Sequence, residues 1–142
     1  MSLGALPLLV IPLIIYNIVV VFAGSGPASG PLGATIFRLP MLSGATWTFT
    51  WSDFILLVTM LMLFAELVKA TYTSTVSLVD HGLSMLVCVI CIVEFVAVRG
   101  FSNSTFFMLL LMTVFDVVAG FTITIVAAKR DFGSSTGIVG TN

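Results

Sequence analysis

Four runs of apolar residues alternate with short polar stretches along this chain. They occupy residues 5–22, 54–73, 81–98 and 104–128. A transmembrane α-helix needs about 20 predominantly apolar residues, and each run reaches or approaches that length. The last three runs are joined by short connections, which favours antiparallel neighbours. The pattern predicts an all-α membrane protein: a four-transmembrane-helix up-down bundle that forms a single integral membrane domain over residues 1–142.

A different pattern lies between the first two runs. Residues 24–33, GSGPASGPLG, are rich in glycine, proline and serine and predict a loop. Residues 46–51, TWTFTW, alternate threonine with aromatic residues, which is typical of a strand with one aromatic face. With Ser43 and Gly44 as turn residues, the pattern predicts a β-hairpin over residues 36–51, outside the bilayer.

The ends of the later helices carry local signals. Ser52 and Asp53 are expected to form an N-cap pair for the second helix. After the fourth helix, residues 129–142 are polar and glycine-rich. We expect this segment to be a flexible tail.

The first apolar run has two interpretations. Pro12 lies inside it and is expected to kink the helix or to begin its straight part. Residues 21–23, VFA, would suit a signal-peptidase site, so the run could be a cleaved signal peptide. It is long for that purpose, and no Lys or Arg precedes it. The retained transmembrane helix is favoured.

Composition excludes a water-soluble protein. Hydrophobic residues make up 59% of the chain and charged residues 8%, whereas a soluble domain carries roughly 25% charged residues. The net charge is −1, and no basic cluster is present that would bind nucleic acid or anchor the chain to anionic lipid. The partner implied by composition is the lipid bilayer.

The basic residues set the expected orientation. With the N-terminus inside, Lys69, Lys129 and Arg130 fall on the cytoplasmic side and Arg38 and Arg99 on the other. Cytoplasmic loops carry an excess of Lys and Arg. We therefore expect both termini in the cytoplasm and the hairpin on the opposite side.

Three carboxylic acids lie inside the apolar runs. Glu66, Glu94 and Asp116 occupy separate runs, and a charged side chain at the bilayer centre costs about 3 kcal/mol on insertion scales. Lys69 follows Glu66 by three residues, so the two can pair on one helix face. His81 begins the third run. We take these five residues as a candidate intramembrane polar or ion site.

Two interpretations of the carboxyl groups remain open. In the structural one, they are partly protonated, hydrogen-bond to groups such as Tyr16 and Asn17, and join the helices. In the functional one, they form a loose ladder that carries protons or a small cation, with Asp80 and His81 at its cytoplasmic mouth.

A second set of residues is a candidate partner surface. Trp47, Phe49 and Trp51 either settle as an aromatic belt at the membrane interface or dock a partner, because a lone hairpin is marginal and has open edges. Gly120 and Thr124 lie four residues apart on the fourth run. Small residues in such a row let another helix approach closely.

No motif indicates catalysis or a cofactor. Cys88 and Cys91 share a helix face, and we interpret them as small membrane-compatible residues, with a redox pair or half a metal site as the alternative. The chain has one His, no Gly-rich phosphate loop and no G-x-S-x-G elbow. We expect no catalytic residue, no bound metal and no cofactor, and therefore not an enzyme.

The stretch from residue 51 to residue 128 resembles a group of small four-helix inner-membrane proteins of bacteria. The resemblance rests on TWTFTWSD, FAELVKAT, DHGLSMLV, STFFMLLLM and FDVVAGF. It implies a bacterial inner membrane and implies no activity. The layout is also similar to that of claudins in topology alone, because the claudin loop motif with its cysteines is missing.

The expected function follows from these absences. We expect a non-catalytic integral membrane protein that acts as a structural or accessory subunit of a membrane complex, with other membrane subunits or copies of itself as partners. The alternative is a small oligomeric proton- or cation-coupled transporter or channel that uses the intramembrane carboxylates.

Overall fold

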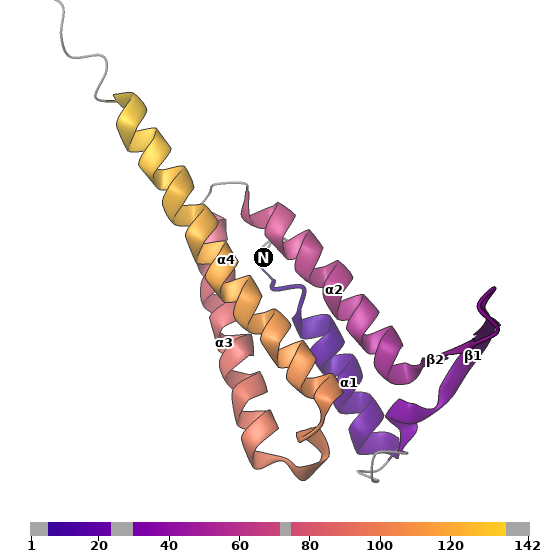
Figure 1. The fold of residues 1–142 in the computed structure, drawn as a ribbon. Coiled ribbons are helices and arrows are strands. Elements are labelled where there is room, and N and C mark those ends of the chain that lie inside the picture. Colours follow the sequence, from indigo (N-terminus) through magenta and orange to yellow (C-terminus); the bar gives the residue numbers. More distant parts are fainter. Residues whose placement is uncertain (1–5, 24–29, 72–74, 136–142) are drawn as a thin grey trace, which may run out of the picture.

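The computed structural model describes residues 6–23, 30–71 and 75–135. These residues form four α-helices with a two-stranded antiparallel hairpin between the first two, as predicted (Figure 1). Two single-turn 3-10 helices, η2 and η3, lie in the connections. The elements are α1 Val10–Ala23, η2 Pro31–Gly33, β1 Thr35–Pro40, β2 Thr46–Thr50, α2 Trp51–Ala70, α3 Thr75–Ala97, η3 Arg99–Phe101 and α4 Ser104–Ser135.

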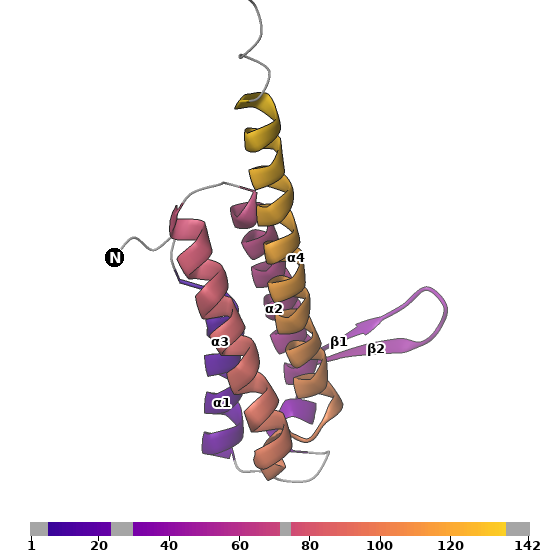
Figure 2. The same ribbon diagram turned by 90° about the vertical axis from the view of Figure 1, so that its left-hand side faces the viewer.

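The helices run alternately up and down in one bundle (Figures 1 and 2). Three of them are long and apolar enough to cross a membrane, over Trp51–Ala70, Val79–Ala97 and Ser104–Val126. The first of the four predicted spans, α1, is shorter than expected. The apolar helix there covers only Val10–Phe22, about 20 Å at a rise of 1.5 Å per residue.

Two prolines explain the late start of α1. The first turns form around Pro7, where the Val10 N–H donates to the Pro7 carbonyl at 3.2 Å and the Ile11 N–H to the Leu8 carbonyl at 3.0 Å. Pro12 then falls in the first turn of α1, where a missing N–H costs no intrahelical bond. It therefore begins the straight helix and does not kink it.

The first helix belongs to the core of the bundle. Leu13, Tyr16 and Val20 are buried in the same cluster as Ile55 and Phe106 of other helices. Loss of α1 after residue 23 would uncover this cluster. Helix α1 is therefore an integral part of the packed bundle.

The second helix begins earlier than predicted, and its cap is a different residue. Thr50 is the N-cap, and Asp53 is the third helical residue of a capping box. The Asp53 N–H donates to Thr50 Oγ1 at 3.3 Å, and the Thr50 N–H donates to Asp53 Oδ2 at 2.8 Å. The predicted cap Ser52 instead donates its hydroxyl to the Leu32 carbonyl at 3.0 Å. The aromatic Trp51 thus belongs to α2 and not to the hairpin.

The last two helices are longer than predicted. Helix α3 begins at Thr75, six residues before the expected start, and α4 continues to Ser135. The prediction treated residues 129–142 as a flexible tail, but residues 129–135 extend α4, and residues 136–142 lie outside the described residues. Polarity ends a membrane span without ending a helix, because the backbone bonds continue in water.

The hairpin is well defined in register. Phe37 pairs with Phe49, Arg38 with Thr48, and Leu39 with Trp47. Gly44 closes the tip with φ of 82°, a left-handed conformation that glycine adopts without steric cost. Figures 1 and 2 both show the hairpin leaving the start of α2 and projecting sideways from the bundle.

Polar side chains lie inside the bundle and large apolar side chains cover its outside, which is the reverse of a soluble protein. Its buried polar side chains are Thr59, Glu66, Asp80, His81, Ser84, Thr113 and Asp116. Large apolar side chains cover the outside, among them Leu57, Leu61, Phe64, Met85, Ile92, Phe115 and Val118. Apolar exposure on this scale is consistent with insertion into a membrane.

Candidate functional site

An ion pair on α2 is the centre of the candidate site. Glu66 and Lys69 lie one turn apart, and Lys69 Nζ is 2.7 Å from Glu66 Oε1. The Glu66 side chain is fully buried, and 24% of the Lys69 side chain is exposed. The spacing predicted this contact, and the structure contains it.

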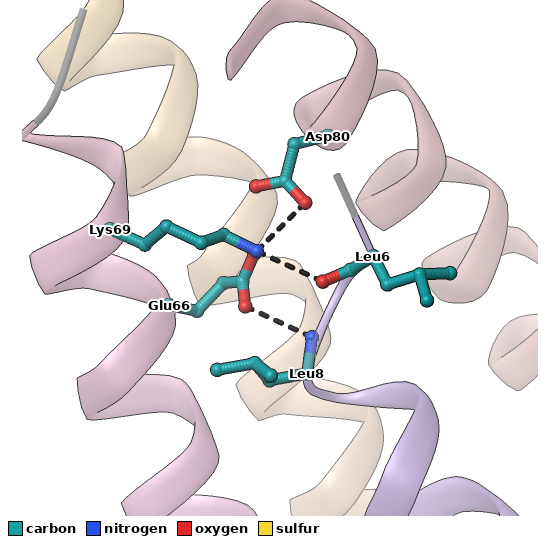
Figure 3. A network of polar contacts seen from close by, with 5 residues as sticks. All are labelled: Leu6, Leu8, Glu66, Lys69 and Asp80. Atoms are coloured by element: carbon teal, nitrogen blue, oxygen red, sulfur yellow. Dashed lines mark hydrogen bonds and ion pairs between the residues drawn. The ribbon is translucent and has the colours of Figure 1, made fainter. Parts of the chain in front are cut away.

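The Lys69 ammonium also joins two other elements, as Figure 3 shows. Its Nζ lies 2.8 Å from Asp80 Oδ1 of α3 and 2.9 Å from the carbonyl oxygen of Leu6, in the segment before α1. The Lys69 Nζ thus donates two hydrogen bonds, to Asp80 and Leu6, and makes an ion pair with Glu66. Lys69 therefore has partners from three elements.

The second Glu66 oxygen faces the start of α1. The Leu8 N–H donates to Glu66 Oε2 at 3.0 Å (Figure 3). Leu8 stands in the turn that leads into α1, where N–H groups have no intrahelical partner and the helix dipole is positive. The Glu66 carboxylate thus caps α1 from a neighbouring helix.

The reason for this arrangement lies in Pro7. Backbone that is not helical needs hydrogen-bond partners wherever lipid excludes water, and the segment at Pro7 leaves the Leu6 carbonyl and the Leu8 N–H without helical bonds. Lys69 and Glu66 supply those two partners. This geometry joins α1 to α2 and α3, and it accounts for both charges.

A further buried polar group lies between α3 and α4. Asp116 of α4 is 2% exposed, and Ser84 and His81 of α3 are equally buried. The His81 imidazole packs over Gly120 so closely that a Cβ added there would lie 2.6 Å from His81 Cε1. It also meets the Phe121 ring, with 5.8 Å between centroids. Gly120 is therefore the point where α4 admits a side chain of α3.

The third predicted carboxyl, Glu94, lies apart from the others. Its Oε2 accepts from Asn17 Nδ2 of α1 at 3.3 Å. Tyr16, next to Asn17, has its hydroxyl 2.6 Å from Asn103 Nδ2, and Asn103 Oδ1 accepts from the Phe106 N–H at the start of α4. Glu94 therefore belongs to a different helix contact from that of Glu66.

The residues of the candidate partner surface also lie in separate parts of the molecule. Trp47 and Phe49 lie on the projecting hairpin, and Trp51 begins α2, where its ring meets Phe54 at 5.7 Å. Gly120 is buried against His81 of the same chain, and the Thr124 hydroxyl donates to the Gly120 carbonyl at 2.9 Å. The close approach predicted from small residues is thus made within the chain.

The cysteines are part of the packing. Cys88 and Cys91 are both buried and form no disulfide. Within residues 6–23, 30–71 and 75–135, no three His, Cys, Asp or Glu side chains come together as metal ligands would.

Some important groups of the site were missed by the sequence reasoning. Asp80 was expected only at the mouth of an ion path, and the backbone groups of Leu6 and Leu8 were not considered. Pro7 carried a usable signal, because a proline near the start of a span leaves neighbouring backbone groups to be satisfied by side chains. Nothing in the sequence indicated that Glu66 would be the side chain to do so.

In comparisons with known proteins, no protein-family model, no curated protein and no solved structure matches this chain.

Proposed function

We propose that this chain is a non-catalytic integral membrane protein that acts as a structural or accessory subunit of a membrane complex. It sits in a bacterial inner membrane with both termini in the cytoplasm and the hairpin outside. The observation that carries this proposal is the hairpin formed by β1 and β2, which projects sideways from the bundle (Figures 1 and 2).

The hairpin has open edges. Within the described residues its sheet contains two strands, so each strand has an outer edge on which no further strand pairs. A two-stranded hairpin is marginal by itself in water, and an open edge is a template for a further strand. An extended segment of another membrane subunit, or the hairpin of a second copy, would pair with either edge.

The interior of the bundle supports the same function. The Lys69 ammonium makes an ion pair with Glu66 and donates to Asp80 and to the Leu6 carbonyl, and Glu66 Oε2 accepts from the Leu8 N–H. Groups held in this way bind helices together, whereas an ion path needs groups that exchange partners. The polar residues therefore support a rigid bundle that presents the hairpin.

Native mass spectrometry tests this proposal on tagged protein extracted in mild detergent from its own membrane. We expect a heteromeric or homo-oligomeric mass. A photo-cross-linking residue at Arg38, on the hairpin, is expected to capture that partner, whereas one at Leu61, on the apolar outside of α2, is expected to capture mainly lipid. A strictly monomeric, partner-free particle would overturn the proposal.

A second candidate function is proton- or cation-coupled transport. One observation favours it: Glu66, Lys69, Asp80 and His81 are ionisable and gather near one end of the bundle, with Asp116 deeper in α4. Four helices of this length are too few for a wide path, so an oligomer would be needed.

Amide variants separate the two functions. Glu66→Gln, Glu94→Gln and Asp116→Asn are reconstituted in liposomes that contain a pH-sensitive dye. Transport predicts that at least one variant loses flux that the unsubstituted protein carries. Equal flux in all four proteins would remove this candidate and leave the structural one.

A further inference from the structure

One face of the hairpin is entirely apolar. The register places Phe37 opposite Phe49 and Leu39 opposite Trp47, and side chains alternate between faces along a strand. The rings pack on one another: Phe37 and Phe49 stack with centroids 4.8 Å apart, and Trp47 meets Phe49 at 5.6 Å. We call Phe37, Leu39, Trp47 and Phe49 the aromatic face.

The opposite face and the tip differ in character. Arg38 pairs with Thr48 on the other face of the hairpin. The tip is apolar, with Leu42 fully exposed and Met41 at 44%. The hairpin is therefore amphipathic across its width and apolar at its end.

The described part of the chain leaves the aromatic face uncovered. Phe37 and Leu39 are each 46% exposed and Trp47 is 45% exposed, although the rings already shield one another. In water this exposure would be costly, at about 25 cal/mol per Å² of apolar surface.

The position of the hairpin decides whether water or lipid surrounds its aromatic face. Strand β2 ends at Thr50 and α2 begins at Trp51 without a linker, so the hairpin starts at the depth where a membrane-length helix starts. Trp51 and Phe54 are exposed there, and the outside of α2 continues apolar through Leu57. The aromatic face is thus attached directly to a surface suited to lipid.

The hairpin leaves the bundle in a sideways direction. Figures 1 and 2, turned by 90° from each other, both show it running sideways and not onward along the bundle axis. A sheet that starts at the end of a membrane span and runs sideways lies along the bilayer surface. At that level, amphipathic aromatic rings have their preferred environment.

We propose that the aromatic face and the tip residues Met41 and Leu42 insert into the boundary between the headgroups and the acyl chains of a phospholipid bilayer. Arg38 and Thr48 on the opposite face point to the phosphates and water. The hairpin is then a lipid-binding arm that lies flat on the membrane. This inference does not depend on the proposed function, because a partner strand would use the edges of the hairpin and not its aromatic face.

The chain contains its own reporters for a test. Its two tryptophans, Trp47 and Trp51, both lie in this region. Trp51→Phe leaves Trp47 as the sole fluorophore on the aromatic face. A matched protein with Trp47→Phe, Trp51→Phe and Thr48→Trp moves the indole by one residue, to the opposite face. Both full-length proteins are reconstituted in phospholipid vesicles.

Quenching is measured with lipids brominated high on the chain, with lipids brominated near the chain end, and with iodide in the aqueous phase. We expect bromines high on the chain to quench Trp47 at least about two-fold more than those near the chain end, with little effect of iodide. The Thr48→Trp protein is expected to be quenched mainly by iodide and little by either brominated lipid.

Three results would overturn the inference. Quenching of Trp47 by iodide alone would place the face in water. Quenching by no reagent would mean that protein, such as a second copy, covers it. Equal responses of the two proteins would show that the hairpin does not lie flat. A monomeric mass in the native experiment leaves this inference untouched, so the two failures are distinguishable.

Discussion

At the scale of single residues, Glu66 shows how a buried carboxylate is held by defined partners. Glu66 makes an ion pair with Lys69 and accepts from the Leu8 N–H. Removing one partner of a buried pair costs more than the pair contributes, because the other charge stays buried. Glu66 and Glu94 both lie inside apolar runs, but they are therefore expected to contribute different amounts to the free energy of unfolding.

Glu66→Ala is expected to lower the free energy of unfolding by roughly 3 kcal/mol, because Lys69 loses one of two carboxylates and α1 loses its cap. Glu66→Gln is expected to cost less, since its side-chain oxygen still accepts from the Leu8 N–H. Unfolding in mixed detergent micelles, followed by circular dichroism, measures both. Glu94→Ala is the control, because half-buried Glu94 has one bond of 3.3 Å, to Asn17. An equal loss in Glu66→Ala and Glu94→Ala would contradict this account.

Two glycines offer a matched pair of substitutions. At Gly120 a new Cβ would lie 2.6 Å from the His81 ring, whereas at Gly82 nothing lies within 4 Å. Gly120→Ala is expected to destabilise the protein by about 2 kcal/mol through overpacking, and Gly82→Ala to stabilise it by up to about 1 kcal/mol through helix propensity. The same unfolding assay measures both. His81→Ala should relieve part of the Gly120→Ala loss, and no relief would show that the imidazole is not the obstacle.

At the scale of elements, the joint between the hairpin and α2 is rigid for a local reason. Thr50 is both the last residue of β2 and the N-cap of α2. Its N–H and hydroxyl both donate to Asp53 Oδ2, at 2.8 and 2.7 Å. One residue therefore ends the strand, starts the helix and sets the direction in which the hairpin leaves the bundle.

Thr50→Ala is expected to cost about 1 kcal/mol through loss of the N-cap. It should also speed amide hydrogen exchange in the first turn of α2, because the capping bonds protect that turn. Thr48→Ala, two residues earlier on the same strand and outside the capping box, is the control. If both variants exchange at the same rate in that turn, the capping box does not hold the joint.

At the scale of the whole molecule, the ends of the bundle differ. The hairpin, the end of α1 and the turn between α3 and α4 lie at one end, and the end of α2 and the continuation of α4 lie at the other (Figures 1 and 2). Lys69 belongs to the last turn of α2. Helix α1 begins near Glu66 and is shorter than its neighbours. The cluster of Glu66, Lys69 and Asp80 lies beside the residues that precede α1, where the chain is not yet helical.

The proposed orientation predicts the labelling of two added cysteines. In a background of Cys88→Ala and Cys91→Ala, Leu42→Cys should react with a membrane-impermeant maleimide in spheroplasts, because the tip lies outside. Lys129→Cys, at an exposed position of α4 beyond the span, should react only after permeabilisation, because the proposed orientation places this end of α4 in the cytoplasm. Mass spectrometry of the labelled protein reads out both. Reversed reactivity would invert the orientation, and equal reactivity would contradict opposite placement of the two sites.

The sequence alone determined the class of protein and its elements. Long apolar runs predict helices for a membrane, because lipid forces backbone groups to pair within a segment, and the alternation in residues 46–51 predicts a strand. The ion pair of Glu66 and Lys69 also follows from spacing. These features depend on neighbours within about one helical turn or one strand, so local periodicity is enough to find them.

Only the tertiary structure decided which helices the polar groups join. Asp80 with Lys69, Glu66 with the Leu8 N–H, Asn17 with Glu94, and His81 with Gly120 are contacts across distant parts of the chain. Their formation depends on the rotation and the relative height of whole helices, which the period of one helix does not specify. Glu66 and Glu94, for example, both contact α1 or the residues before it, but at Leu8 and at Asn17, because each carboxyl accepts from the group that packing placed beside it.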